Sequence, residues 1–307
     1  MEKASNKFQI IDSIMNTPGN VLRIDDLCKT AGVSRSGYYN WKSSEEKRKQ
    51  RELQDQKDFE LILIAFKYRG YDKGIREIHM KLLHMDPPIH MNVKKIQRLM
   101  RKYGLLCPIR KANPYRRMAK ALKTNNYSEN LVQREFKEHG ARSILLTDIT
   151  YLPYNGTYAY LSTILDAFTK QVLSYVLSDS LKVDFVLLTV EQLIKEHGIA
   201  LTAETILHSD QGVHYTSYKF IEIVNDSGLR QSMSRRGNCW DNAPQESFFG
   251  HMKDEIDITK CITFEDVKEI IDDWIDYYNN ERYQWQLAKL APNEYYNDIT
   301  TGVYPMK

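Results

Sequence analysis

Three acidic residues have surroundings that could support chemistry on a phosphodiester. Asp148 lies within the apolar run Ile144–Leu152, and Asp210 ends a second apolar run. Glu246 opens an amphipathic stretch, with 35 residues between it and Asp210. Two carboxylates at strand ends and a third on a helix can hold two divalent metal ions, which activate a water or a sugar 3′-hydroxyl for in-line attack. The chain therefore needs elements that bring these carboxylates together and a surface that delivers nucleic acid to them.

Each acid also has a structural interpretation, because a single aspartate at a strand end is more often a cap, a turn or a surface group. Only the grouping of the three favours catalysis. Two other acids compete with them. Asp166 ends the second predicted strand, and we expect a structural role for it. Glu255 lies about half a turn around the helix from Glu246, so it faces away from that residue. His208 could orient the site, although a structural imidazole is the simpler interpretation.

Residue spacing separates two faces of the helix expected from Asn242 to Ile256. The apolar side chains gather on one face, which should pack against a sheet: Phe248, Phe249, Met252 and Ile256. Glu246, Gly250 and Lys253 follow an i, i+4, i+7 spacing and share the adjacent face. A carboxylate would thus lie beside a cation able to meet a phosphate, and Gly250 would let DNA approach closely.

The hydrophobic pattern around these acids predicts an α/β domain. Strands are expected at 144–152, 158–166, 171–178, 204–208 and 230–234, with helices at Val183–Glu196 and 217–227 between them. The helix that carries Glu246 follows the last strand. This order predicts a mixed sheet of five strands with helices packed against it.

Charge is distributed unevenly over the 307 residues, a length that allows two or three domains. The net charge is only +3, yet residues 1–125 carry +14 and residues 126–307 carry −11. A basic half on an acidic body suggests that the N-terminal half meets a polyanion. No run of 18 apolar residues and no signal peptide is visible, so we expect a cytoplasmic protein, at the nucleoid when bound to DNA, with no membrane partner.

Cysteine and histidine usage gives no sign of a disulfide framework or a structural zinc site. Cys28, Cys107, Cys239 and Cys261 form no CxxC pair. His79 and His84 have a spacing close to that of zinc ligands, but only Cys107 lies nearby in the sequence. Ordinary buried or surface side chains are the expected interpretation.

The basic half contains two helical units that could bind DNA. In the first, Ile24–Ala31 and Ser34–Trp41 flank Gly32, and Ser34 is a natural N-cap. This pattern predicts a helix-turn-helix whose second helix offers four residues to DNA: Arg35, Ser36, Tyr39 and Lys42. A small three-helix unit without DNA contact shows the same pattern, and both interpretations remain open.

The second unit ends in a helix, Val93–Tyr103, with an apolar stripe and a basic remainder. Five residues make up its basic side: Lys94, Lys95, Arg98, Arg101 and Lys102. A solvated basic face is the simpler interpretation, but the +14 of the surrounding residues favours phosphate contacts. The predicted domains are a helix-turn-helix at 1–45, a helical connector at 46–69, this unit at 70–109, a basic linker at 110–140 and a catalytic domain at 141–300.

The amino-acid sequence around the acids resembles that of one protein family. The segments TDITYLP, YLSTILDAFTK, HSDQGVHYTS, MSRRGNCWDNAPQESFFGHMKDE and YNNERYQWQLAKLAPNEYY resemble the transposases of bacterial insertion sequences. So do LCKTAGVSRSGYYNWK and the stretch from Ile96 to Leu106, and the resemblance covers roughly residues 20–297. This family belongs to the superfamily of retroviral integrases, and the chain is most similar to the downstream product of two-frame elements.

The resemblance implies a ribonuclease-H-like catalytic core and assigns Asp148, Asp210 and Glu246 as catalytic and metal-binding residues. It also implies that Lys253 contacts the terminal bases of the element. Two Mg²⁺ ions, with Mn²⁺ as a substitute, would support nicking at the 3′ end and strand transfer. The implied partners are double-stranded DNA, a second copy of the chain in a homodimer or larger assembly, and an upstream-frame protein or fusion.

Two alternatives to a transposase remain. The first is a DNA-binding regulator of transposition with an inactive catalytic domain, which would bind the same ends without cutting them. The intact set of three acids speaks against it. The second is a metal-dependent nuclease, which would cleave DNA without joining it.

Overall fold

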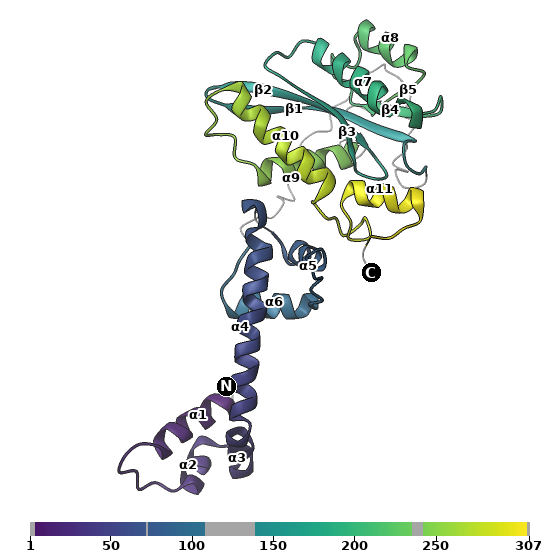
Figure 1. The fold of residues 1–307 in the computed structure, drawn as a ribbon. Coiled ribbons are helices and arrows are strands. Elements are labelled where there is room, and N and C mark those ends of the chain that lie inside the picture. The colour runs from purple at the N-terminus through teal and green to yellow at the C-terminus, as the bar shows by residue number, and fades with distance from the viewer. Residues whose placement is uncertain (1–3, 72, 108–138, 235–241, 306–307) are drawn as a thin grey trace.

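The computed structural model describes residues 4–71, 73–107, 139–234 and 242–305. Figure 1 shows three bodies along its length: an N-terminal helical unit, a second helical unit reached through the long helix α4, and an α/β domain. The predicted linker at 110–140 lies almost wholly outside the described residues. Within the described part of the chain, no helix is both long and apolar enough to cross a bilayer.

The N-terminal unit consists of α1 (Ala4–Met15), α2 (Ile24–Ala31) and α3 (Arg35–Ser43). Its small core joins Ile11, Cys28 and Tyr38. The side chain of Ser34 accepts a hydrogen bond from the backbone N–H of Gly37 at 3.0 Å, which confirms the predicted N-cap. The sequence analysis did not predict α1, although Ile11 supplies a buried side chain that α2 and α3 need as a third wall.

The second helical unit is built from α4 (Glu45–Lys67), α5 (Ile75–Leu83) and α6 (Val93–Lys102). A short 3₁₀ turn at Tyr68–Gly70 follows α4. All three helices contribute to one core: Ile62, Ala65, Ile78, Leu82, Ile96 and Leu99. The later half of α4 therefore belongs to this unit, while its earlier half is largely exposed and links the unit to α3.

The α/β domain contains a mixed sheet of five strands, which confirms the predicted fold class. In chain order the strands are β1 (Ile144–Tyr154), β2 (Thr157–Asp166), β3 (Val172–Ser178), β4 (Ile206–Ser209) and β5 (Arg230–Met233). The spatial order is β3-β2-β1-β4-β5. Strands β1, β2 and β3 pair antiparallel, whereas β4 and β5 run parallel to β1. This mixed pairing makes β1 the central strand.

Helices cover both faces of the sheet, with α7 (Asp184–His197) and α8 (Tyr218–Asp226) on one side. The other side carries α9 (Ala243–Glu255) and α10 (Phe264–Asn280), followed by α11 (Pro292–Thr301). A 3₁₀ turn at Gly198–Ala200 ends α7. Alternate residues of β1 point to opposite faces. Accordingly Leu145 belongs to the core under α7, and Leu152 to the core under α9.

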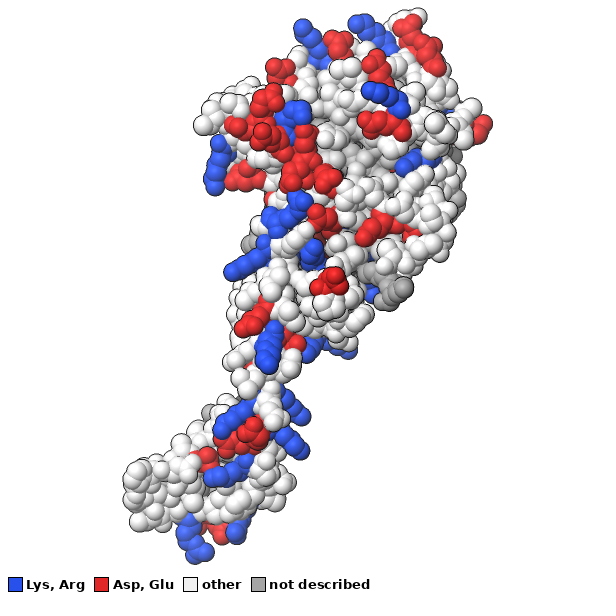
Figure 2. Space-filling view, in the orientation of Figure 1, with Lys and Arg blue, Asp and Glu red and all other residues white. Residues whose placement is uncertain are grey.

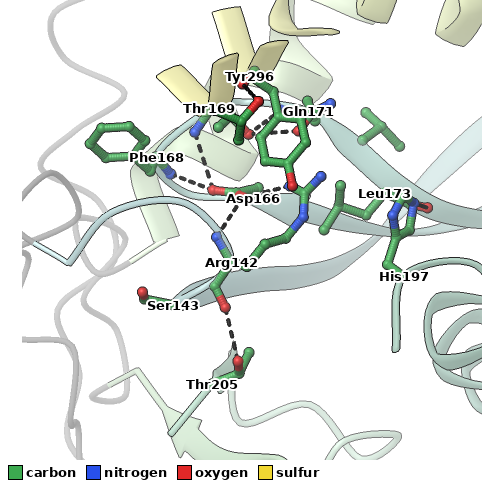
Figure 3. A network of polar contacts seen from close by, with 12 residues as sticks. Arg142, Ser143, Asp166, Phe168, Thr169, Gln171, Leu173, His197, Thr205 and Tyr296 are labelled. Carbon is green, nitrogen blue, oxygen red and sulfur yellow. Dashed lines mark hydrogen bonds and ion pairs between the residues drawn. The ribbon is translucent and has the colours of Figure 1, made fainter. Parts of the chain in front are cut away.

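A buried ion pair closes the end of the sheet where β1 begins (Figure 3). Arg142 Nη1 lies 2.7 Å from Asp166 Oδ2, and the backbone N–H of Arg142 donates to the same oxygen at 2.9 Å. Oδ1 accepts from the backbone N–H groups of Phe168 and Thr169. The guanidinium also lies 4.2 Å from the ring centroid of Tyr296 on α11. Both carboxylate oxygens of Asp166 thus have partners within the fold, and the residue has the structural role that the sequence analysis expected.

Ion pairs join the second helical unit to the α/β domain, and the one between Arg282 and Glu255 is buried. Arg69 lies 2.9 Å from Glu281 and 2.7 Å from Asp273. Arg282 pairs with Glu255, the last residue of α9, at 2.7 Å, and approaches Glu77 of α5 at 3.6 Å. Glu255 therefore connects α9 to the neighbouring units, as befits a side chain that faces away from Glu246.

Candidate active site and DNA-contacting residues

Sheet register brings Asp148 and Asp210 together. In the parallel pair of β1 and β4, Leu146 lies opposite His208. Continuing that register by two residues places Asp148 beside Asp210, which directly follows the last residue of β4. Neighbouring strands lie about 4.8 Å apart. One oxygen of Asp210 accepts the backbone N–H of Gly212 at 2.8 Å, a local turn that holds its carboxylate at the strand end.

Helix α9 brings Glu246 to the same face of the sheet. Its apolar side chains Phe248 and Met252 are buried in the core under α9, as predicted from their spacing. Pro244 lies in the first turn of the helix, where a missing N–H costs nothing. The side chain of Gln245 donates to the hydroxyl of Thr163, the residue on β2 that lies opposite Asp148. Glu246 is the next residue after this contact.

Electrostatics shows independently that the three carboxylates share one environment. The pKa of Asp148 is raised to about 7, first by burial and then by the charges of Asp210 and Glu246. A hydrogen bond from the backbone N–H of Ile149 and the charge of Lys253 act in the opposite direction. The two acids and the lysine predicted for the site therefore all act on the carboxyl of Asp148.

The raised pKa of Asp148 predicts a pH-dependent stability of the metal-free protein. Since an unfolded aspartate titrates near about 3.9, the folded state binds the extra proton between roughly pH 4 and 7. This stabilising contribution is complete below about pH 4 and is lost as the pH rises through about 7.

Thermal unfolding in EDTA, measured between pH 4.5 and 8, tests this dependence. Asp148→Asn cannot gain the buried charge, so its melting temperature should exceed that of the wild type by more as the pH rises. Parallel curves for the two proteins would contradict the assignment.

The donor set fits a hard divalent cation. All three groups are carboxylates, and oxygen ligands are those that Mg²⁺ prefers. Mutual repulsion of Asp148, Asp210 and Glu246 raises the pKa of Asp148, and a bound cation would relieve that repulsion. Within the described ranges, no three acidic, histidine or cysteine side chains are arranged to enclose a metal ion. Asp210 and Glu246 are both exposed, so their side chains have room to turn toward a cation.

The sequence analysis missed several buried polar residues around the site. Tyr215 is only 1% exposed, and its pKa is raised well above the ordinary value by burial and then by the charge of Asp148. Its hydroxyl lies near Thr147 without a hydrogen bond of ordinary geometry. Gln245 and Thr163 are fully buried. The one sequence signal for these residues is a polar side chain at a position where the periodicity predicts burial. Such residues often have a structural role in the core and no role in a site.

The basic residues of α6 fall into two groups. Three of them pair with acids of α4: Lys95 with Asp58 at 2.5 Å, Arg98 with Asp55 at 2.7 Å, and Lys102 with Glu52 at 2.6 Å. Lys94 and Arg101 are exposed, and no carboxylate among the described residues lies within ion-pair distance of either. Figure 2 shows the resulting mixture of basic and acidic side chains along α4, and an acidic gathering over α10.

This difference predicts unequal contributions of the α6 residues to DNA binding. Lys94 and Arg101 lie seven residues apart on one helix face, so we expect Lys94→Ala/Arg101→Ala to weaken binding to any sequence and to lower its salt dependence by about two counterions. Lys95→Ala/Arg98→Ala should instead lower the melting temperature, because the changes remove the ion pair of Asp58 and one of the two ion pairs of Asp55.

Binding isotherms at several salt concentrations test this prediction, with the second variant as the matched control. An unchanged salt slope for the Lys94 and Arg101 variant would exclude these residues from phosphate contact.

The residues predicted on α3 lie on an accessible surface. Tyr39 is 47% exposed, and Ser36 lies beside it in the first two turns. Arg35 forms an exposed pair with Asp25 at 3.2 Å, and Lys42 lies 2.8 Å from Asp12 of α1. Exposed pairs contribute little energy and can exchange their partners for a phosphate.

Models of known protein families match both the helical part and the α/β part of the chain. Two models described as an integrase core domain match residues 138–239 and 227–292, and a model described as an HTH-like domain matches residues 53–113. The last match includes the later half of α4, which packs with α5 and α6 in the structure.

Curated relatives extend over nearly the whole chain. InsK of Escherichia coli, named as a transposase of insertion sequence element IS150, is 31% identical over 92% of this chain and 97% of its own length. A transposase-like protein of Haemophilus influenzae is 36% identical over 67% of this chain and 94% of its own length. The InsF transposase of insertion sequence IS3A from Escherichia coli is 27% identical over 89% of this chain and 94% of its own length.

Solved structures with similar chains include the catalytic core domain of HTLV-2 integrase in complex with magnesium. It is 15% identical, with a TM-score of 0.39 over 50% of this chain and 94% of that chain. The matched family models and the near full-length relatives decide the family. The chain belongs to the insertion-sequence transposases, with an HTH-like domain ahead of an integrase core domain.

Proposed function

We propose that this protein binds the terminal inverted repeats of an insertion sequence, nicks the DNA at the 3′ ends and joins those ends to a target. One observation carries the proposal. Asp148 lies on β1, Asp210 directly follows β4 and Glu246 lies on α9, and burial together with the charges of Asp210 and Glu246 raises the pKa of Asp148. The membership of the chain in the transposase family supports the same reaction class.

Asp148, Asp210 and Glu246 would hold two Mg²⁺ ions, or Mn²⁺ in their place. When bound, such ions supply Lewis-acid activation of a water or a 3′-hydroxyl and stabilise charge on the scissile phosphate. Lys253, two turns after Glu246 on α9, acts on Asp148 electrostatically and would contact a phosphate or base near the cleaved bond. The reaction needs no covalent protein–DNA intermediate, so no serine or tyrosine nucleophile is assigned.

The helical units would bring the DNA ends to this site. The proposed contacts are Arg35, Ser36, Tyr39 and Lys42 on α3, and Lys94 and Arg101 on α6. Lys95, Arg98 and Lys102 remain predicted contacts, provided that DNA phosphates replace the acids of α4. Because two ends must be joined, the active form is a homodimer or a larger assembly on DNA, with or without an upstream-frame protein or fusion.

A strand-transfer assay distinguishes this function from the two alternatives. Purified protein, Mg²⁺ and a labelled duplex of the element end are compared with a Glu246→Gln variant. Joined products from the wild type alone support a transposase. Nicked products without joining would indicate a nuclease, and tight binding without nicking by either protein would indicate a regulator.

A further inference from the structure

A buried polar contact lies between the helix of Glu246 and the strand next to Asp148. Gln245 of α9 and Thr163 of β2 are both 0% exposed. The side-chain amide of Gln245 donates a hydrogen bond to the hydroxyl of Thr163. The same amide carries an oxygen that is buried without a hydrogen-bond partner. A polar group in this position is therefore costly, and the core around it is otherwise apolar.

The contact has a defined place relative to the acids. Thr163 lies directly opposite Asp148 in the antiparallel pair of β1 and β2. Residues opposite each other in such a pair point to the same face, with Cβ atoms about 4.5–5.5 Å apart. Gln245 directly precedes Glu246 in the first turn of α9. The hydrogen bond thus ties the strand neighbour of one predicted catalytic acid to the chain neighbour of another.

Apolar packing alone would not specify the rotation of α9 equally well. Phe248, Phe249 and Met252 supply the packing energy of this helix, and apolar side chains tolerate small sliding and rotation. A hydrogen bond between two buried atoms is directional and holds one register of the first turn.

We propose that Gln245 and Thr163 are positioning residues that set the location of Glu246 relative to Asp148. Their hydrogen bond holds the first turn of α9 against β2 and so fixes the backbone from which Glu246 would reach a divalent cation shared with Asp148. This inference rests on the function proposed above, since it assigns a role within that same site.

The opposite face of the sheet offers a matched control. Ser162 precedes Thr163 on β2, is also 0% exposed, and accepts a hydrogen bond at 2.9 Å from the hydroxyl of Thr189 on α7. Both contacts join a buried β2 hydroxyl to a helix. Removal of either hydroxyl should therefore cost stability. Only the contact of Thr163 lies on the face of the acids, so only removal of the Thr163 hydroxyl should disturb the site.

The experiment uses the full chain and four variants: Thr163→Val, Gln245→Met, Thr163→Ser and Ser162→Ala. Strand-transfer kcat and KM for end DNA are measured together with thermal unfolding. Calorimetric Mn²⁺ binding to the protein without DNA supplies a readout that needs no catalysis. All assays are run well below the melting temperature of the least stable variant.

We expect Thr163→Val and Gln245→Met to lower kcat and to weaken Mn²⁺ binding, each on the order of tenfold, with KM for DNA unchanged. Thr163→Ser should retain both properties, because it keeps the hydroxyl. Ser162→Ala should lower the melting temperature by a similar amount and leave kcat and Mn²⁺ binding unchanged.

Normal kcat and Mn²⁺ binding in Thr163→Val and Gln245→Met would overturn the inference, as would equal losses in Ser162→Ala. A wild-type protein that binds Mn²⁺ but joins no DNA would overturn the proposed function instead, and the Mn²⁺ arm would still decide the inference. A wild-type protein that binds no Mn²⁺ would overturn both.

Discussion

Substituting any one of the three carboxylates, by Asp148→Asn, Asp210→Asn or Glu246→Gln, should lower strand transfer by about a thousandfold or more while the protein stays folded. Each substitution keeps the shape of the side chain and removes one negative ligand. The remaining two acids would hold the divalent cations less well, which weakens the Lewis-acid activation that the cations would supply. The loss should appear in kcat and in single-turnover rates, with the affinity for end DNA nearly unchanged.

The stability of these variants separates a catalytic role from a structural one. Because burial and the neighbouring charges oppose ionisation of Asp148, Asp148→Asn should unfold at a higher temperature than the wild type in EDTA at pH 8. The added stabilisation by Mg²⁺ should shrink in all three variants. Glu191→Gln, an exposed acid on α7 at the opposite face, serves as the control and should behave like the wild type. Retention of a tenth of the wild-type rate in any triad variant would exclude that residue from the site.

The second large effect concerns stability. Asp166→Ala should lower the free energy of unfolding by about 3–5 kcal/mol, because it leaves the buried guanidinium of Arg142 without its counter-charge. Arg142 is only 6% exposed, so water cannot replace the lost partner. Three backbone N–H groups, from residues 142, 168 and 169, lose their acceptor in the same change.

An exposed ion pair with a similar N···O distance supplies the control. Arg230 and Glu204 lie 2.8 Å apart, but their side chains are 48% and 82% exposed. Glu204→Ala should therefore cost no more than about 1 kcal/mol. Urea denaturation of both variants measures the difference. Where Asp166→Ala remains folded it should keep strand transfer, since Asp166 pairs with Leu145, three residues before Asp148. Equal costs in the two variants, or a folded but inactive Asp166→Ala, would contradict the structural role.

Much of the α/β domain could be predicted from the sequence. The expected strands at 144–152, 158–166 and 171–178 correspond to β1, β2 and β3, and the later strands and helices follow in the predicted order. Alternation along β1 also places Asp148 on the same face as Leu146 and Thr150. These properties are local, because side-chain direction repeats every two residues in a strand and every 3.6 in a helix.

The helical half was harder to predict for a physical reason. Residues 46–69 were predicted to form only a helical connector, yet the second half of α4 contributes Ile62 and Ala65 to a core with α5 and α6. The basic residues of α6 formed one set in the sequence. Packing against α4 divides them, since Asp55 lies 43 residues before its partner Arg98 and Asp58 lies on the same helix as Asp55 and pairs with Lys95.

The sequence by itself determined the order of the elements, the side of each strand and helix on which the acids lie, and the family resemblance that assigns them. Those features depend on residue type and short-range periodicity. The tertiary structure alone decided which charges are paired and which polar groups are buried: Arg142 with Asp166, Arg282 with Glu255, and Gln245 with Thr163. Each of these pairs joins residues separated by 24 to 82 positions, and only the packing of whole elements brings such residues within hydrogen-bond distance.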